Sequence, residues 1–255
     1  MVRYKRMVLT MTHLFEASNV QCSITVDGRS HTIFSGLSFY LDAGQIVDLT
    51  GPSGAGKSSL LTAFARLNPQ ASGEYALDGR PANDFTAQQW RAQIAYLPQK
   101  PVLLGETVAQ AIRLPFTLAI RQPTKQGPRK SSSMDVLPDD TIRRTLDGMG
   151  CSDIDLGRPP HDLSGGQAAR VSLARTLLTK PKVLLADEVD AGLDDDNARK
   201  VAGILADAAA DGMAIIRIRH RQPDGLATRT MRLADGMLTP IDDPSHDARQ
   251  EEARA

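Results

Sequence analysis

The chain has 255 residues, of which 41% are hydrophobic, and its 30 basic and 30 acidic residues give a formal net charge of zero. These values indicate a soluble globular protein of one large or two small domains, and the lack of a basic excess argues against nucleic acid as a main partner. No apolar run approaches the ~18 residues that a membrane helix needs, so work at a membrane would require a partner chain that spans it.

The first part of the chain shows strand patterns and then a helix. Residues 1–12 are expected to form a disordered extension. Between residues 14 and 39, short segments alternate apolar and polar side chains, and Asp27-Gly28 is typical of a hairpin turn between two of them. A strand is predicted at 45–50, before a glycine-rich loop, and a helix at 57–67 after it. Further strands are expected at 75–79 and 94–97.

The second part has helical character with interruptions from 107 to 163. Within it, the Pro-, Ser- and Lys-rich stretch 121–138 is predicted to be a mobile loop with solvated basic side chains. The apolar run at 183–186 is typical of a strand buried on both faces of a parallel sheet. Helices are expected at 167–178 and 197–210, a strand at 213–218, an edge strand pair at 231–238 and a disordered tail at 242–255. The whole pattern predicts an α/β core with an inserted, mostly helical segment.

The first chemical motif is Gly51-x-x-x-x-Gly56-Lys57-Ser58, with a predicted strand before it and a helix after it. This is the Walker A pattern, in which backbone amides and a helix N-terminus face the phosphates of a nucleotide. In such a loop Lys57 supplies a charge to the β- and γ-phosphates and Ser58 a hydroxyl to Mg²⁺. The alternative is a glycine-rich turn that binds nothing, but every position of the pattern is filled.

The second motif follows the strand at 183–186, where two adjacent carboxylates, Asp187 and Glu188, end the apolar run. Ligands of open α/β sheets gather at the carboxyl ends of the strands. Asp187 is therefore predicted to help hold Mg²⁺, and Glu188 to polarise the attacking water as a general base. The alternative is an acidic strand end that faces solvent.

The third motif is Leu163-Ser164-Gly165-Gly166-Gln167, directly before a predicted helix. A serine and glycines at a helix start form a second anion-binding terminus, although an ordinary helix cap has the same residues. One chain thus offers two phosphate-binding helix starts for one nucleotide.

These three motifs, in this order and spacing, resemble those of ATP-binding-cassette (ABC) ATPases, from about Leu14 to Leu238. The resemblance implies a P-loop NTPase fold: an α/β RecA-like core, an antiparallel β subdomain and an inserted helical ABC-specific subdomain at about 100–165. Residues 13–241 would form this single domain. In the family two domains pack head to tail, and each ATP lies between the Walker A loop of one and the signature of the other. The implied partners are a second copy or a paired cassette and an integral-membrane permease, with no nucleic acid. The implied location is cytoplasmic, at the inner face of the cell membrane.

The resemblance also assigns further residues. Gln99 matches the Q-loop glutamine and His220 the switch histidine, while 191–194 resembles the D-loop and Arg170 a packing and charge partner after the signature. On this basis ATP and Mg²⁺ are the expected cofactors. The implied catalytic residues are Glu188, His220, Gln99 and Lys57; the nucleotide-binding residues are Gly51, Pro52, Ser53, Gly54, Ala55, Gly56, Lys57, Ser58, Ser59, Ser164, Gly165, Gly166 and Gln167; the Mg²⁺ ligands are Ser58, Gln99 and Asp187.

Three features depart from the family pattern. The stretch 23–26 lacks the aromatic residue that usually stacks on adenine, which predicts weak selectivity for the base. Val189-Asp190 stands where the family most often has Pro-Thr. His220 is flanked by Arg217, Arg219 and Arg221, an unusually basic segment.

The motifs do not assign the chain to one subfamily of ABC ATPases. The stretches 101–107, 113–116 and 181–185 resemble the small bacterial ATPases of iron exporters of the FetA or YbbL type, although other bacterial importers and exporters share much of them. A non-transport ABC ATPase or a regulatory ATP-binding module is the alternative. A DNA-repair ABC protein would need long coiled-coil heptads, and a translation factor of this family would carry two cassettes.

Overall fold

The computed structural model describes residues 13–121 and 137–241. The extension expected at 1–12, the tail expected at 242–255 and most of the loop expected at 121–138 lie outside the described residues. The strands are β1 Phe15–Val26, β2 Arg29–Leu41, β3 Ile46–Thr50, β4 Ala71–Leu77, β5 Arg80–Pro81, β6 Ile94–Leu97, β7 Val183–Asp187, β8 Ala214–Ile218, β9 Arg229–Ala234 and β10 Met237–Ile241. The helices are α1 Lys57–Phe64, α2 Ala87–Gln93, α3 Val108–Arg113, α5 Asp139–Gly148, α6 Gly165–Leu178 and α7 Asp195–Ala210, with short 3-10 turns η1 Ala82–Asp84, η2 Leu114–Thr117, η3 Ala119–Arg121 and η4 Pro160–Asp162.

A six-stranded sheet forms the centre of the molecule, in the order β10-β9-β3-β8-β7-β6. All neighbouring pairs are parallel except β9 and the antiparallel edge strand β10. Every residue of β7 and β8 is buried, which explains the continuous apolar run at 183–186. The predicted parallel α/β core is therefore confirmed.

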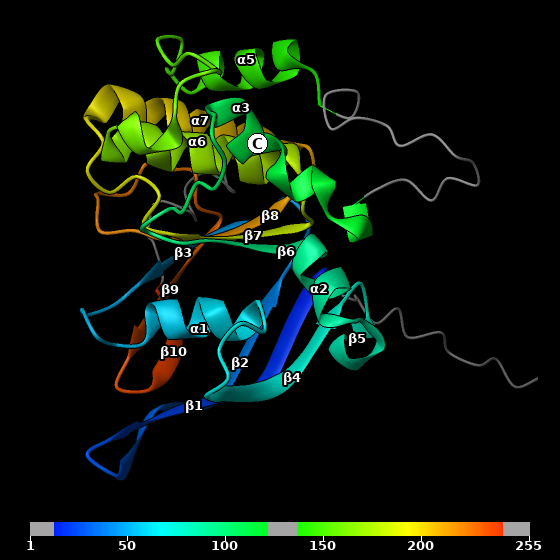
Figure 1. The fold of residues 1–255 in the computed structure, drawn as a ribbon. Helices are drawn as coiled ribbons and strands as arrows, with labels where there is room; N and C mark the ends of the chain where they lie inside the picture. The colour runs from blue at the N-terminus through cyan, green and yellow to red at the C-terminus, as the bar shows by residue number, and fades with distance from the viewer. Residues whose placement is uncertain (1–12, 122–136, 242–255) are drawn as a thin grey trace, which may run out of the picture.

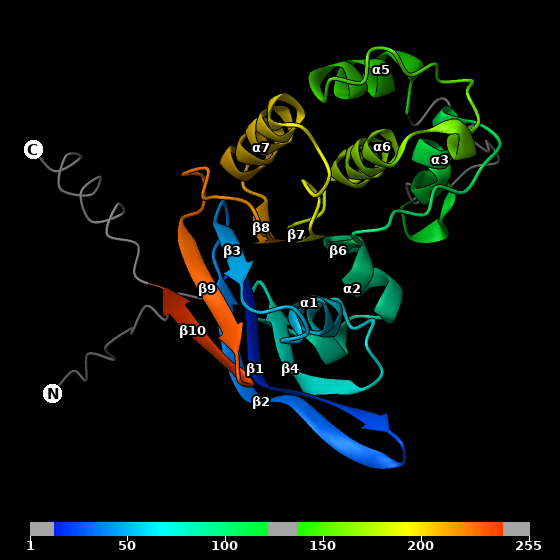
Figure 2. The ribbon, with the colours of Figure 1, turned by 90° about the vertical axis from the view of Figure 1, so that its left-hand side faces the viewer.

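The two faces of this sheet pack on different layers (Figure 1). Val47 and Leu49 of β3 face a core shared with α1 and the antiparallel strands, whereas Ile46 faces a core shared with α3, α5, α6 and α7. Figure 2 shows α1 on one side of the sheet and α6 and α7 on the other. Side-chain alternation along β3 thus separates the two layers.

A second, antiparallel sheet has the order β2-β1-β4-β5 and lies beside α1 (Figure 2). Asp27 and Gly28 join β1 to β2 with φ of 50° and 75°, as a hairpin with two left-handed central residues requires. The predicted hairpin turn is confirmed. Trp90 of α2 is fully buried against Phe15 and Tyr75, and its ring nitrogen donates to Phe64 O at 3.0 Å.

The helical segment contains α3, α5 and the described turns η2, η3 and η4, and its helices α3 and α5 pack against α6 (Figure 1). Arg121 differs from the expectation of a solvated side chain, because it donates to Thr179 O at 2.8 Å and to Ala92 O at 3.0 Å. Leu137, at the other end of the predicted loop, is buried. Among the residues that the structure describes, no helix has both the length and the apolar composition to cross a membrane.

Two local differences concern helices. The helix predicted at 57–67 ends at Phe64, and Arg66 takes a left-handed φ of 53° while its side chain donates to Ala82 O. Helix α2 was not predicted. It begins with a capping box in which Thr86 accepts from the Gln89 amide and the Gln89 side chain accepts from the Thr86 amide.

Candidate functional site

The glycine-rich loop 51–58 connects the carboxyl end of β3 to α1. Gly51 has a φ of 140°, and a Cβ there would lie 2.0 Å from Leu233 O of β9. Gly56 caps α1 with a φ of 94° and provides no side-chain cap to the first amides of the helix. The loop therefore has the backbone shape that only glycine allows at these positions, and its helix start is available to an anion.

Lys57 is 7% exposed and folds back over this loop. Its Nζ donates to Gly51 O and to Pro52 O, both at 2.9 Å. Ser58 and Ser59 follow it in the first turn of α1. The predicted phosphate-binding residues of the loop thus surround the positive charge of Lys57 and the N-terminus of α1.

Asp187, the last residue of β7, is buried at the carboxyl edge of the sheet. Tyr96 of the neighbouring strand β6 donates its hydroxyl to Asp187 Oδ2 at 2.9 Å. Burial, together with the charge of Asp187, raises the pKa of Tyr96, so the hydroxyl stays protonated and acts as a donor. The sequence reasoning missed Tyr96, although its place three residues before Gln99 on a predicted strand was a usable signal.

Glu188 follows Asp187 and accepts from residues of two other loops. Gln99 Nε2 donates to its Oε2 at 2.6 Å, and His220 Nε2 lies 2.8 Å from its Oε1. Glu188 has a left-handed φ of 52°, a conformation that costs a non-glycine residue of order 1–3 kcal/mol and is found where structure around a site imposes it. Three of the four predicted catalytic residues therefore meet at one carboxylate.

An ionic cluster lies behind this carboxylate, on the α7 side of the sheet, and three of its members, Asp48, Asp190 and Arg217, are buried. It contains Asp48, Asp190, Arg217, Arg219 and Asp224, and we call these five residues the ionic cluster. Arg217 of β8 donates to Asp48 of β3 at 2.7 and 3.2 Å and to Asp224 at 2.9 and 3.0 Å. Arg219 donates to Asp190 at 3.0 Å.

The pKa values in the ionic cluster reflect burial and pairing together. Burial raises the pKa of Asp48, and the charge of Arg217 offsets part of the rise. Burial also opposes ionisation of Asp224 and of Arg217, but their mutual hydrogen bonds outweigh it, so the pKa of Asp224 is lowered and that of Arg217 is raised. The unusually basic segment around His220 is therefore neutralised by carboxylates that the sequence reasoning did not connect with it.

The signature residues form the start of α6. Ser164 accepts from the Gln167 amide at 3.2 Å, and the Gln167 side chain accepts from the Ser164 amide at 3.0 Å and donates to Asp153 at 2.9 Å. A Cβ at Gly166 would meet Leu193 at 3.3 Å. Arg170 donates to the buried Cys151 sulfur at 3.0 Å. Since α6 and α1 cover opposite faces of the sheet, the signature lies apart from the phosphate loop of its own chain (Figure 2).

The stretch 23–26, which lacks the aromatic residue that usually stacks on adenine in the family, lies at the end of β1 in the hairpin. Ser23 pairs with Thr32, and Ile24 with His31, across the strands. Ile33 of β2 lies against the phosphate loop, because its Cγ2 is 2.4 Å from the place of a Cβ on Gly56. The hairpin thus lies close to the loop but provides no ring from the expected stretch.

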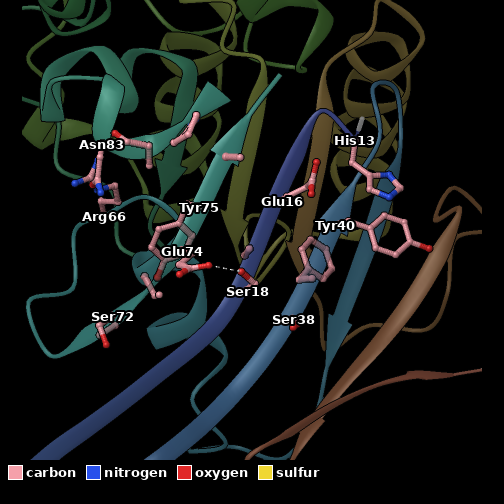
Figure 3. Close-up of a pocket in the computed structure, with 18 of the residues that line it drawn as sticks. His13, Glu16, Ser18, Ser38, Tyr40, Arg66, Ser72, Glu74, Tyr75 and Asn83 are labelled. Carbon is pink, nitrogen blue, oxygen red and sulfur yellow. Dashed lines mark hydrogen bonds between the residues drawn. The ribbon is translucent and has the colours of Figure 1, made fainter. Parts of the chain in front are cut away.

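A separate cavity of about 1060 Å³ lies on the antiparallel subdomain (Figure 3). Its labelled lining residues include His13, Tyr40, Arg66 and Glu74. None of the predicted site residues lines it. This cavity is therefore distinct from the candidate site.

The oxygen donors of Ser58, Asp187 and Gln99 suit a hard cation such as Mg²⁺. Gln99 directs its amide nitrogen to Glu188, so its oxygen is the atom that could meet a metal ion. In residues 13–121 and 137–241, no group of three or more His, Cys, Asp or Glu residues forms a metal cage. Mg²⁺ commonly uses one or two carboxylates plus substrate phosphates, so this sparse donor set fits it.

Comparison with known proteins gives a consistent result. Residues 34–191 match the protein family described as "ABC transporter". The methionine import ATP-binding protein MetN 1 of Pseudomonas syringae is 33% identical over 212 residues, which are 81% of this chain but 60% of that protein. The "Probable iron export ATP-binding protein FetA" of Escherichia coli K12 is 33% identical over 169 residues, 66% of this chain and 69% of that protein. The fold matches the ATP-binding cassette MJ0796, solved as a dimer with ADP and Pi, with a TM-score of 0.72 and 22% identity over 90% of this chain and 99% of that one. The phosphate loop, the paired carboxylates and these matches together show that the chain belongs to the ABC transporter family.

Proposed function

We propose that this chain binds ATP with Mg²⁺ and hydrolyses it to drive transport through a separate integral-membrane permease. The observation that carries this proposal is the arrangement at Glu188. Its carboxylate accepts from Gln99 and His220, directly after the buried Asp187 and at the same sheet edge as the phosphate loop. A carboxylate oriented by two neighbours at the carboxyl ends of parallel strands suits a general base for water.

Each residue has a role that follows from its contacts. Glu188 takes a proton from the attacking water, and Gln99 and His220 keep its two oxygens in place. Lys57, which binds loop carbonyls in this structure, exchanges them for phosphate oxygens when nucleotide binds. Mg²⁺, held by Ser58, Asp187 and Gln99, would neutralise charge on the phosphates.

The active arrangement is a pair of cassettes. The signature at the start of α6 lies on the face of the sheet opposite to α1, so its serine and glycine amides cannot serve the loop of the same chain. A second copy, or a homologous cassette, would supply Ser164, Gly165, Gly166 and Gln167 to the nucleotide. The dimeric state reported for MJ0796 supports this arrangement.

The chain is proposed to attach peripherally to the cytoplasmic face of the membrane through its permease. The names of its relatives support a transport role, and none of them fixes the cargo. MetN 1 is named for methionine import and FetA for iron export, at equal identity to this chain. Metal export is therefore one candidate, and stimulation of hydrolysis by iron salts in the co-purified pair would support it over methionine.

The test is steady-state hydrolysis of Mg-ATP by the chain co-purified with its permease. Glu188→Gln should lower the turnover by about 10²–10⁴-fold and leave ATP binding intact. Glu74→Gln, an exposed carboxylate on β4 outside the site, is the matched control and should hydrolyse ATP at the wild-type rate. A wild-type complex without hydrolysis, or a Glu188→Gln variant with the normal rate, would overturn the proposal.

A further inference from the structure

The contact between Glu188 and His220 joins two loops and not two strands. Glu188 is the first residue after β7, and His220 is the second residue after β8. Their side chains meet at 2.8 Å across these loops. A reacting geometry built on loops needs support from neighbouring side chains, because loops define positions less exactly than strands do.

Two arginines on either side of His220 bind the segment that follows Glu188. Arg219 donates from its Nε to Asp190 Oδ2 at 3.0 Å. Arg221 donates to Asp195 Oδ1 at 2.8 Å and to the carbonyl oxygen of Leu193. The loop of His220 is thus tied to the loop of Glu188 both before and after the histidine.

The first of these ties is buried and anchored to the sheet. The side chains of Arg219 and Asp190 are 8% and 11% exposed. Arg219 also lies 2.6 Å from Asp224, and Asp224 accepts from Arg217. Arg217 binds Asp48, its directly paired residue on β3. The ion pair of Arg221 is less protected from solvent, because its partner Asp195 is 84% exposed.

The sequence marks Asp190 and Arg219 as unusual independently of each other. Asp190 stands where the resemblance predicts threonine, and Arg219 belongs to the unusually basic segment before His220. The structure brings these two residues into contact. Two departures that meet in one buried ion pair point to a shared role.

We propose that Asp190 and Arg219 are a positioning pair that holds His220 against Glu188. This inference rests on the proposed ATP hydrolysis. Neither residue contacts the reacting atoms. Arg219 acts through its neighbour His220, and Asp190 acts through Glu188, two residues before it. Without the pair, only the more exposed tie from Arg221 joins the two loops, and Glu188 loses the contact that orients one of its oxygens.

The experiment compares Asp190→Asn, Arg219→Gln and the double variant with Asp48→Asn as the control. Asp48 belongs to the same ionic cluster and lies 3.9 Å from Arg219, but its hydrogen bonds go to Arg217, and it lies on β3, outside the two loops that the tie joins. For each variant, kcat and KM for Mg-ATP are measured with the co-purified permease, thermal unfolding is followed by the fluorescence of Trp90, and the crystal structure of Asp190→Asn is solved.

Asp190→Asn and Arg219→Gln should each lower kcat by at least about 10-fold, since a misplacement near 1 Å can cost about 100-fold, and leave KM within about 2-fold. The double variant should fall no further than the worse single variant, because both remove one shared interaction. Asp48→Asn should unfold at a lower temperature but keep kcat per folded molecule within about 2-fold. The crystal structure of Asp190→Asn should show the 2.8 Å contact between His220 and Glu188 broken.

A normal kcat in Asp190→Asn, additive losses in the double variant, or an equal loss in Asp48→Asn would overturn the inference while the proposed function stands. If the wild-type complex does not hydrolyse ATP, the proposed function fails instead. The crystal structure then decides the inference alone, since an intact contact in Asp190→Asn would refute it.

Discussion

Replacement of Arg217 by methionine should show how strongly the ionic cluster stabilises the fold. Arg217 is 2% exposed and makes four hydrogen bonds to Asp48 and Asp224. Removing one partner of a buried ion pair leaves uncompensated charge and costs about 3–5 kcal/mol. Against a total stability of about 5–15 kcal/mol, this loss is large enough to measure easily.

Arg221→Met is the matched control, because Arg221 lies four residues further along and its partner Asp195 is 84% exposed. An exposed pair of this kind contributes about 0–1 kcal/mol. Urea unfolding at pH 7.5 can be followed for both variants by the fluorescence of Trp90, the single tryptophan of the chain, which is fully buried.

The penalty of Arg217→Met should also depend on pH. Burial already raises the pKa of Asp48, and loss of Arg217 removes what offsets that rise. A carboxyl group whose folded-state pKa lies above its unfolded value destabilises the fold above that pKa, and the cost disappears as the pH falls through it. The loss of stability should therefore shrink from pH 7.5 to pH 5. Equal losses in the two variants, or a penalty that does not decrease in acid, would refute this reasoning.

Three further predictions concern the nucleotide. Lys57→Ala should weaken ATP binding by about 10–100-fold in calorimetry, since it removes a charge-assisted hydrogen bond worth about 1.5–3 kcal/mol; unchanged affinity would exclude the phosphate role of Lys57. Gly51→Ala should abolish ATP binding, because its Cβ would collide with Leu233 O. In the control Gly54→Ala the new Cβ has nothing within 4 Å, so this variant should keep part of its affinity for ATP. Equal effects of the two substitutions would contradict the geometry. Because the stretch 23–26 lacks a ring, ATP and ribose triphosphate should bind within about 3-fold of each other, whereas stacking of about 1–3 kcal/mol would separate their affinities by about 5- to 160-fold.

The core strands could be predicted because a strand buried on both faces needs a continuous run of apolar residues. The apolar run before Asp187 is the strand β7, buried on both faces, and Ile94–Leu97 is β6 with the bounds that the pattern predicts. Helix α2 shows the opposite case. Its capping residues, Thr86 and Gln89, were visible in the sequence, but the helix has only 7 residues and lacks a long periodic pattern.

The end of α1 could not be predicted from propensity. Nothing in the residues after Phe64 forbids another helical turn until Asn68-Pro69. Tertiary contacts end the helix, because Arg66 donates to Ala82 O while its own carbonyl accepts from Arg91. Contacts between distant segments override local preference here.

At the candidate site, the motifs predicted which residues matter but not how they pair. Gln99, Glu188 and His220 were each assigned from their place in a motif, and the structure brings them together. The bond between Tyr96 and Asp187 could not be foreseen, because it depends on the register of β6 against β7. Such pairings join residues tens of positions apart and follow only from the assembled sheet.

The left-handed backbone at Glu188 has a consequence for protein engineering. Glycine adopts a φ of 52° without the penalty that glutamate incurs, so Glu188→Gly can gain about as much stability from relaxed backbone strain as glycine loses in chain entropy. A selection for heat resistance alone would therefore tolerate variants at this position that have lost their base. Libraries built on this chain should be screened for turnover as well as for melting temperature.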